Sequence, residues 1–226
     1  PGITTIEESK ISRNHTEIFL KKINADIKIK KRKGTNLISL KGQKNLHAFN
    51  YTVGSDPSSA AFLIALTLLT PGAKLTIHNV ICNDTRIQFI KILKKMNAKI
   101  KIKNLRRAPD SGEFLGSITT FGSNLKPITI SKDIAKFVDE LPLLFACASL
   151  TKGISRFKNV HELLHKESNR LLESKKILTQ AGIKCKITKS NMITIYGKNK
   201  IKTQNKSILV KTSGDHRICL AAAIYS

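Results

Sequence analysis

Three segments of the chain share one pattern of apolar and polar positions, which is helical at first and alternating after a short turn. They cover residues 19–31, 92–104 and 177–189, with the sequences FLKKINADIKIKK, ILKKMNAKIKIKN and ILTQAGIKCKITK. Apolar residues in each segment recur first at helical spacing and then at every second position. We therefore predict the end of a helix, a turn and a strand at all three places.

A second element lies between these segments, and it is an apolar helix opened by aspartate. DPSSAAFLIALTLL begins at Asp56, DELPLLFACASL at Asp139 and DHRICLAAAIY at Asp215. Aspartate is a favoured N-cap, so each of the three is predicted to cap a helix. A glycine and a predicted strand ending in Asn-Val follow the first two helices, within 71–80 and 151–160.

The two elements together give one repeated unit with the order strand, helix, strand, helix, strand, strand. The three aspartates stand 83 and 76 residues apart, and a period of this length indicates a repeated supersecondary unit. The fold class is therefore predicted to be α/β (α+β), built from βαβαββ units and truncated at both ends. Further strands are predicted at 36–40, 49–53, 128–130, 192–196 and 207–210.

The start of a new unit at Asp56 predicts a division of the chain. We expect a hinge near residues 51–55, with the preceding βαββ segment packing separately. Residues 1–53 would then be the end of a first domain, and residues 54–226 most of a second domain. A continuous layer across residues 30–70 would contradict this division.

Charge is the most unusual feature of the composition. The formal net charge is +25, and 32 of the 40 basic residues are lysine. Nucleic acid is one partner that such a charge suggests. However, recognition of bases and phosphates relies on arginine forks and stacking aromatics, which are scarce here, and there is no Trp. We expect no nucleic-acid partner and favour a small anionic substrate, with a lysine-rich RNA-binding protein as an alternative.

The apolar runs and the cysteines place the chain in a cellular compartment. The longest apolar run, residues 60–70, is too short to cross a bilayer, and no leader is visible, so we expect a cytoplasmic protein without a membrane partner. The cysteines lie far apart without a C-x-x-C pair, which is typical of reduced, buried thiols. They are Cys82, Cys147, Cys185 and Cys219.

Arginine is rare, and four of the eight arginines fall at predicted helix starts: Arg13, Arg86, Arg170 and Arg217. A helix N-terminus attracts anions, and a guanidinium binds phosphate or carboxylate with two parallel hydrogen bonds. The spacing therefore predicts an anion site. The alternative is that these arginines cap neighbouring strands or pair with acids, for which Glu17, Asp84 and Glu167 are the candidates.

Three acidic residues stand close to these cations in the sequence. Asp139 and Glu140 open an apolar helix, and Glu167 lies between Lys166 and Arg170. An acid beside cations keeps its charge or exchanges protons with a bound anion. The alternatives are a plain N-cap for Asp139 and a partner of the helix dipole for Glu167.

Six stretches resemble the EPSP synthase family of enolpyruvyl transferases, in family order along the whole chain. They are ISRNHTEIFL (11–20), SDPSSAAF (55–62), NDTRIQFIKILKKMNA (83–98), FVDELPLL (137–144), HELLHKESNRL (161–171) and GDHRICLAAAI (214–224). The resemblance implies an inside-out α/β barrel fold with three βαβαββ units per domain and a cleft between two domains. It also implies transfer of the enolpyruvyl group of phosphoenolpyruvate to the 5-hydroxyl of shikimate 3-phosphate, without a metal or organic cofactor.

The resemblance also assigns roles to residues. Asp139 and Glu167 would be catalytic. Shikimate 3-phosphate would contact Arg13, Asp139 and Lys166, and phosphoenolpyruvate would contact Arg170, His216 and Arg217. Other parts of the family pattern are missing, so the resemblance implies a fragment that is inactive alone and a protein that is monomeric at full length.

Some positions depart from the family pattern. Leu164 and His165 replace Arg-Val, Asn169 replaces Asp, and Gly54-Ser55 replace Pro-Gly. Asn97 replaces a turn glycine, and asparagine tolerates the left-handed conformation that such a turn requires. The nearest alternative is the sister transferase that acts on UDP-N-acetylglucosamine, which the D-E-x-P and K-E-S-x-R stretches disfavour.

The HELLH sequence at residues 161–165 matches the pattern of zinc metalloproteases. A zinc site needs both histidines on one helical face and a third ligand. The repeat instead places HELLH in a loop after the strand that ends at Val160. Purified protein should therefore contain no stoichiometric zinc by elemental analysis. One zinc per chain that is lost in the His161→Ala variant would contradict this interpretation.

Overall fold

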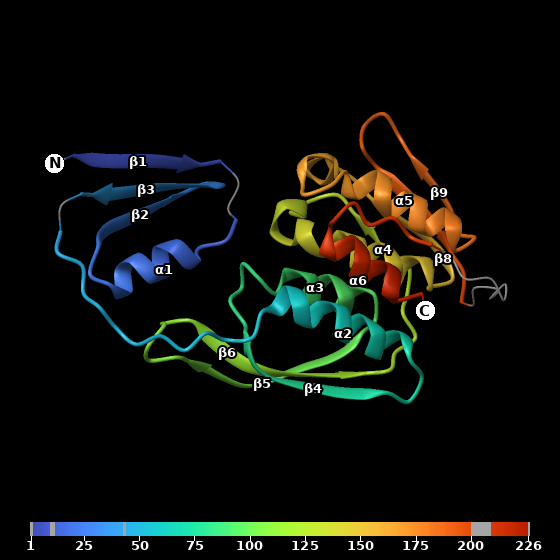
Figure 1. Cartoon of the computed structure of the whole chain (residues 1–226), viewed down its shortest axis with the longest axis horizontal. Helices are drawn as coiled ribbons and strands as arrows, with labels where there is room; N and C mark the ends of the chain where they lie inside the picture. Colours follow the sequence, from blue (N-terminus) through green and yellow to red (C-terminus); the bar gives the residue numbers. More distant parts are fainter. Residues whose placement is uncertain (1, 10–11, 43, 200–208, 226) are drawn as a thin grey trace.

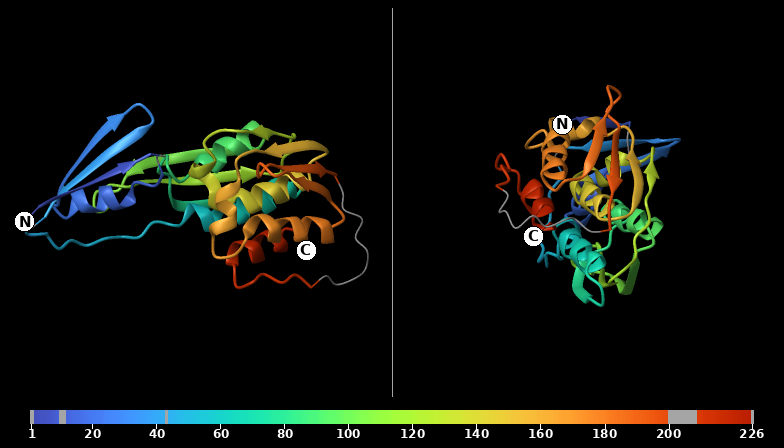
Figure 2. Two further views of the ribbon diagram at one scale, coloured as in Figure 1. Left: turned by 90° about the horizontal axis from the view of Figure 1, so that it is seen from above. Right: turned by 90° about the vertical axis from the view of Figure 1, so that its right-hand side faces the viewer.

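The computed structural model describes residues 2–9, 12–42, 44–199 and 209–225. Three sheets and their helices form the described part of the chain, as Figure 1 shows. The first sheet and its helix lie at one end of the molecule, apart from a larger body that holds the other two sheets (Figures 1 and 2). The structure therefore has a small N-terminal body and a large body.

The N-terminal body is a βαββ unit. It consists of β1 (Ile3–Glu8), α1 (His15–Lys22), β2 (Asp26–Arg32) and β3 (Thr35–Lys41). The strands are antiparallel in the order β1-β3-β2, and α1 packs against β2. The predicted helix, turn and strand in 19–31 and the strand at 36–40 are confirmed.

The strand predicted at 49–53 is wrong. Residues 44–54 run without regular secondary structure. Two aromatic rings of this segment pack on the helix instead of joining a sheet, since the rings of Phe49 and Tyr51 lie 5.4 Å and 5.9 Å from that of Phe19. The segment joins the two bodies, and among the described residues of 30–70 no sheet continues from one body into the other.

The second unit contains α2 (Pro57–Leu69), β4 (Lys74–Ile81), α3 (Gln88–Lys95), β5 (Lys99–Arg107) and β6 (Phe114–Phe121). Its strands are antiparallel in the order β4-β6-β5. The entering strand is reduced to one parallel bridge between Ser55 and Val80. Ser55 N donates to the carbonyl of Asn79 at 2.9 Å, and Ile81 N donates back to the carbonyl of Ser55 at 3.0 Å.

The third unit has the full set of elements. It runs through β7 (Thr129–Ile130), the 3-10 helix η1 (Ile134–Glu140), α4 (Leu141–Ser149), β8 (Gly153–Phe157), the 3-10 helix η2 (His161–His165), α5 (Arg170–Gln180), β9 (Lys184–Ile187) and β10 (Ile193–Gly197). The strand order is β7-β8-β10-β9, with β7 parallel to β8. Helix α6 (His216–Ala223) follows. Residues 209–210 are not in a strand, and residues 207–208 of the strand predicted there lie outside the described residues.

The repeat is confirmed by the topology. The antiparallel orders β1-β3-β2, β4-β6-β5 and β8-β10-β9 are the same. Asn24, Asn97 and Gly182 occupy equivalent turns after a helix and have φ angles of 66°, 71° and 70°, a left-handed conformation that asparagine and glycine adopt most readily. The fold is α/β, as predicted.

The core lies where the helices of the second and third units meet. All nine residues of α4 are buried, and α4 packs against α2, α5 and α6. Figure 1 shows α2 and α3 lying over one face of the β4–β6 sheet. Each fully buried leucine or phenylalanine of this kind contributes about 1.5–3 kcal/mol. Among the described residues, no helix combines the length and the apolar character that a membrane span requires.

Two predictions about single residues need correction. Asp56 and Asp215 cap α2 and α6 with their side chains, but Asp139 lies in η1 and does not cap a helix, because α4 begins two residues later beside Pro142. Cys82 and Cys147 are buried as expected, whereas Cys185 is half-buried. Cys219 is exposed, because it lies on the outer face of α6.

Gly197 at the end of β10 provides a test of the packing between the third sheet and α4. A Cβ atom there would overlap the carbonyl oxygens of Thr151 and Ala148, which are main-chain atoms and cannot rotate away. We expect Gly197→Ala to lower the free energy of unfolding by about 1–3 kcal/mol, measured by urea unfolding. Gly42→Ala is the control, because its Cβ would lie at an ordinary 3.6 Å from the nearest atom. Equal stability of the two variants would contradict the packing.

Candidate functional site

The carboxylate of Asp139 lies among four cationic side chains. Arg13 Nη2 is 2.5 Å from Asp139 Oδ2, while Arg170 Nη1 and Lys166 Nζ lie 3.1 Å and 3.3 Å from Oδ1. Arg217 Nη2 is 3.9 Å from Oδ2, and Arg217 Nη1 donates to the main-chain carbonyl of Asp139 at 3.4 Å. One carboxylate is therefore contacted by cations from distant parts of the sequence.

Each of these side chains comes from a different segment of the chain. Arg13 precedes α1 in the N-terminal body, Asp139 stands near the end of η1, and Lys166 follows η2. Arg170 is the first residue of α5, and Arg217 is the second residue of α6. The starts of α1, α5 and α6 thus meet at the end of η1.

Arg170 is the most buried of the cations, with a side chain that is 0% exposed. Its Nε and Nη2 atoms donate to Asp215 at 2.8 Å and 3.3 Å, and Nη2 lies 2.6 Å from Glu167 Oε2. Asp215 also accepts from Ser168 Oγ at 2.9 Å. A buried guanidinium needs such partners, because an unpaired charge away from water is very costly.

Glu140, next to Asp139, belongs to the same group. Its side chain is 3% exposed, and its Oε1 accepts a hydrogen bond from Ser58 Oγ at 2.6 Å. Arg217 Nη1 lies 3.7 Å from that oxygen. The role of Ser58 was not predicted, because this contact joins residues 82 positions apart in the sequence.

The environment moves the pKa values of the neighbouring carboxyls in opposite directions. Burial acts to raise the pKa of Asp139, but the charges of Arg217, Lys166 and Arg13 outweigh burial and hold it below the usual value. Burial raises the pKa of Glu140, and the hydrogen bond from Ser58 only partly opposes the effect. Asp139 is therefore an anion at neutral pH.

A hollow of about 410 Å³ lies beside Asp139. Its lining comes from the N-terminal body, the segment before α3, η1 and the segment around η2: Ser12, Arg13, Thr85, Ala135, Lys136, Phe137, Val138, Asp139, Glu140, Glu162 and Lys166. The hollow thus lies between the two bodies. Its cations make it suitable for an anionic small molecule.

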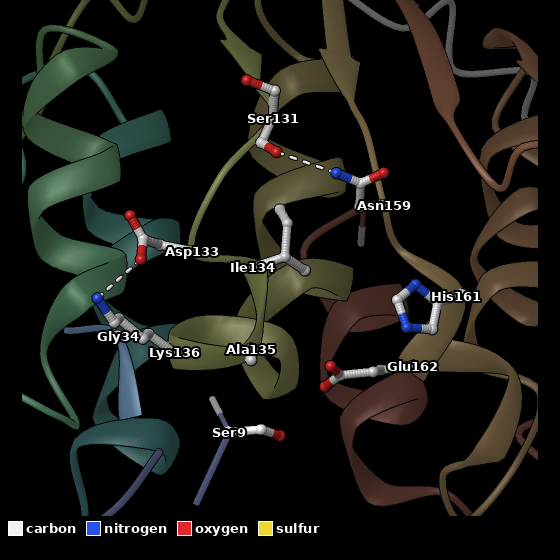
Figure 3. A pocket seen from close by; sticks show the side chains of 10 residues that line it. All are labelled: Ser9, Gly34, Ser131, Asp133, Ile134, Ala135, Lys136, Asn159, His161 and Glu162. Atoms are coloured by element: carbon white, nitrogen blue, oxygen red, sulfur yellow. Dashed lines mark hydrogen bonds and ion pairs between the residues drawn. The ribbon is translucent and has the colours of Figure 1, made fainter. Parts of the chain in front are cut away.

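A second hollow of about 450 Å³ adjoins the first, because both include Ala135, Lys136 and Glu162 in their lining. Figure 3 shows its side chains, with Lys136 paired to Asp133 and the amide of Asn159 donating to the carbonyl of Ser131. Most of the cations around Asp139 do not reach it. The first hollow is therefore the better candidate for the anion site.

Two of the predicted site residues are placed less centrally. The side chain of Glu167 is 56% exposed and pairs with Arg170. His216 is exposed at the first position of α6. Within the described part of the chain, it takes no part in the contacts around Asp139. The five that come together are Arg13, Asp139, Lys166, Arg170 and Arg217.

The HELLH residues form the short 3-10 helix η2, and the prediction of a loop there is wrong in this respect. His161 and Glu162 line the second hollow (Figure 3). Within the described ranges, no group of three or more His, Cys, Asp or Glu side chains is arranged to hold a metal ion.

Arg86 has different partners from those considered in the sequence. Asp84 pairs with Lys91, at 3.2 Å, rather than with Arg86. Arg86 forms an ion pair with Asp56 and donates to Ser58 Oγ at 3.1 Å. Arg86 and Asp56 occupy the positions in the second unit that Arg170 and Asp139 occupy in the third, and both pairs form ion pairs. The repeat in the sequence could therefore have indicated Asp56 as the partner of Arg86.

One family's sequence model matches residues 1–226, and its description is EPSP synthase (3-phosphoshikimate 1-carboxyvinyltransferase). A Helicobacter pylori (strain G27) protein named 3-phosphoshikimate 1-carboxyvinyltransferase is 36% identical, over 99% of this chain and 52% of that protein. A protein of the same name from Caldicellulosiruptor bescii is 34% identical, over 99% of this chain and 50% of its own length. The chain thus spans about half the length of the curated relatives it matches.

Solved structures give the same result. An EPSP synthase from Acinetobacter baumannii superposes with a TM-score of 0.84 and 34% identity, covering 99% of this chain and 50% of that one. The enolpyruvyl transferase NikO from Streptomyces tendae superposes with a TM-score of 0.67 at 15% identity, which is a likeness of fold alone.

The cation group around Asp139 predicts a pH-dependent contribution to stability. The pKa of Asp139 is lower in the folded chain than its usual value, so its contribution is present at neutral pH and is lost as the pH falls through the folded pKa. We expect Asp139→Asn to lower the free energy of unfolding at pH 7 by about 1.5–3 kcal/mol, and the difference from the parent to shrink towards pH 2. Urea unfolding at several pH values measures both.

Asp84→Asn is the matched control, because Asp84 is 81% exposed and pairs only with an exposed lysine. Its effect should be close to zero at every pH. A loss in Asp139→Asn that does not change with pH would contradict the electrostatic explanation.

Proposed function

The chain belongs to the EPSP synthase family, and we propose that the protein transfers the enolpyruvyl group of phosphoenolpyruvate to the 5-hydroxyl of shikimate 3-phosphate. The observation that carries this proposal is the convergence of Arg13, Lys166, Arg170 and Arg217 on Asp139 beside a hollow between the two bodies. Both proposed substrates are anions that carry a phosphate group. A hollow lined by cations suits them.

The cations divide between the two substrates. Arg13 and Lys166 line the hollow and would hold shikimate 3-phosphate. Arg170 and Arg217 are held next to Asp139 by carboxylates, and we assign them to phosphoenolpyruvate, with His216 beside them. Arginine suits the second role because its planar fork matches a phosphate or carboxylate with two hydrogen bonds.

The two catalytic carboxylates have different environments, which suits different roles. Asp139 is held as an anion by its neighbours, so it can accept the proton of the 5-hydroxyl as the oxygen bonds to the central carbon of phosphoenolpyruvate. Glu167 is more exposed and would give a proton to the methylene carbon. Glu167 then takes a proton back from that carbon as the C–O bond to phosphate breaks, and the inorganic phosphate leaves with the proton that Asp139 accepted from the hydroxyl.

Further features belong to the same proposal. The reaction would need no metal or organic cofactor, because proton transfer and charge stabilisation by side chains are sufficient for it. We propose residues 1–53 as the end of a first domain and residues 54–226 as most of a second. The complete protein would be monomeric and cytoplasmic. The transferase acting on UDP-N-acetylglucosamine is not favoured, since the relatives are named for the shikimate reaction.

The test uses this chain together with the part of the Helicobacter pylori relative that lies outside the match, produced in the same cells. Formation of the enolpyruvyl product from phosphoenolpyruvate and shikimate 3-phosphate is followed by 31P NMR. We expect turnover from the complemented protein and none from this chain alone. In the complemented protein, Asp139→Asn and Glu167→Gln should each lower kcat by about 10²–10⁴-fold.

Asp84→Asn is again the control and should keep the parent rate, and circular dichroism checks that each variant folds. Turnover with UDP-N-acetylglucosamine instead of shikimate 3-phosphate would favour the sister transferase. RNA binding that weakens steeply with salt, without any effect of shikimate 3-phosphate, would favour the nucleic-acid alternative and overturn the proposal.

A further inference from the structure

A group of polar contacts meets at Arg86, the residue after Thr85, which lines the hollow beside Asp139. The Arg86 side chain is 12% exposed. Its guanidinium forms an ion pair with Asp56, donates to Ser58 Oγ at 3.1 Å and lies 3.3 Å from His15 Nε2. His15 belongs to the N-terminal body, and the other two residues belong to the start of α2. One side chain therefore joins the two bodies.

In one direction the contacts lead to Asp139. Ser58 is 1% exposed and donates to Glu140 at 2.6 Å. Glu140 is the next residue after Asp139, and its Oε1 lies 3.7 Å from Arg217 Nη1. The Ser58 hydroxyl therefore holds the side chain of the residue next to Asp139, and that side chain is also a partner of Arg217.

In the other direction the contacts lead to Arg13. His15 stands two residues after Arg13, and its Nδ1 is in hydrogen-bond contact with the buried carboxylate of Glu113. The preceding residue, Asn14, accepts a hydrogen bond from Asn83 at 2.8 Å. The start of α1 is thus fixed against the second unit next to Arg86, which sets where Arg13 can reach.

We propose that Arg86 is a positioning residue for the proposed enolpyruvyl transfer. It holds Arg13, through His15, and Asp139, through Ser58 and Glu140, at the separation that both substrates require. This inference rests on the proposed function. Arg86 is not among the residues that line the hollow beside Asp139, so it acts through these neighbours rather than on a substrate.

Only arginine can make this arrangement. Its guanidinium presents donors in one plane and can bond a carboxylate, a hydroxyl and a ring nitrogen together, whereas the lysine ammonium is a compact point charge. Arg86→Lys keeps the charge and loses the fork. The variant therefore separates the geometry of the side chain from its charge, and it is more conservative for folding than Arg86→Gln.

The first measurement is the distance between the two bodies in the 226-residue chain. Spin labels are placed on Lys30→Cys in β2 and Lys175→Cys in α5, which are both exposed positions. Cys185→Ser and Cys219→Ser remove the accessible native thiols. Pulsed EPR should give one narrow distance distribution for this labelled parent.

The distribution should broaden in Arg86→Lys and in Ser58→Ala. It should stay narrow in Arg156→Gln, the matched control, because Arg156 is exposed on β8 and is not among the residues that line the hollow beside Asp139. Circular dichroism and urea unfolding establish that each variant is folded. If Arg86→Lys does not fold, the distance distribution of Ser58→Ala tests the proposal by itself. An unchanged distribution in folded Arg86→Lys and folded Ser58→Ala would overturn the proposal.

The second measurement is a double-mutant cycle of Arg13 and Arg86, read out as the dissociation constant for inorganic phosphate. If Arg86 had a merely structural role, the effects of the two substitutions on this constant would be additive. Arg13→Gln should raise this constant about tenfold in the parent, the usual effect of one charged hydrogen bond. In the Arg86→Lys chain the same change should have less than about a twofold effect, because Arg13 is already misplaced.

The outcomes distinguish the two proposals. Additive effects of Arg13→Gln and Arg86→Lys would overturn the positioning role and leave the proposed function standing. A parent chain that binds no phosphate would count against the proposed anion site. The spin-label distances would still decide whether Arg86 fixes the two bodies.

Discussion

The burial of the Arg170 guanidinium is the constraint on which the large body depends. A cation removed from water costs several kcal/mol unless carboxylates compensate it. The structure brings three to it, Asp139, Glu167 and Asp215, from the end of η1, the segment before α5 and the cap of α6. These elements cannot separate without leaving the guanidinium unpaired, so the site and the core are held by the same contacts.

The same pairing recurs in the repeat. Arg86 pairs with Asp56 in the second unit, and Arg170 pairs with Asp139 at the equivalent positions of the third. Asp56 also caps α2, which leaves its carboxylate satisfied inside its own unit. Asp139 caps no helix, because η1 precedes α4, and its carboxylate remains available to cations from elsewhere. A small change in where the helix begins thus separates a structural aspartate from a candidate catalytic one.

The large positive charge is compatible with this fold because of strand periodicity. In β5 the lysines at 99, 101 and 103 are exposed, while Ile100 between them is buried. Side chains alternate between the two faces of a strand, so lysine can fill one face without entering the core. The ammonium groups of Lys74 and Lys101 each lie 5.9 Å from the centre of the Phe121 ring, where an aromatic face attracts a cation. The buried arginine Arg170 is instead surrounded by the carboxylates of Asp139, Glu167 and Asp215.

The sequence by itself determined the repeated helix–turn–strand elements, the caps at Asp56 and Asp215, and the placement of four arginines at helix starts, because periodicity and capping are local properties of the chain. Only the tertiary structure decided that Arg13 reaches Asp139, 126 residues away, and that Ser58 donates to Glu140. It also replaced the strand predicted at 49–53 by a single bridge at Ser55. The physical reason is that these contacts depend on how whole units pack against one another, and packing joins residues whose neighbours in the sequence carry no sign of the partner.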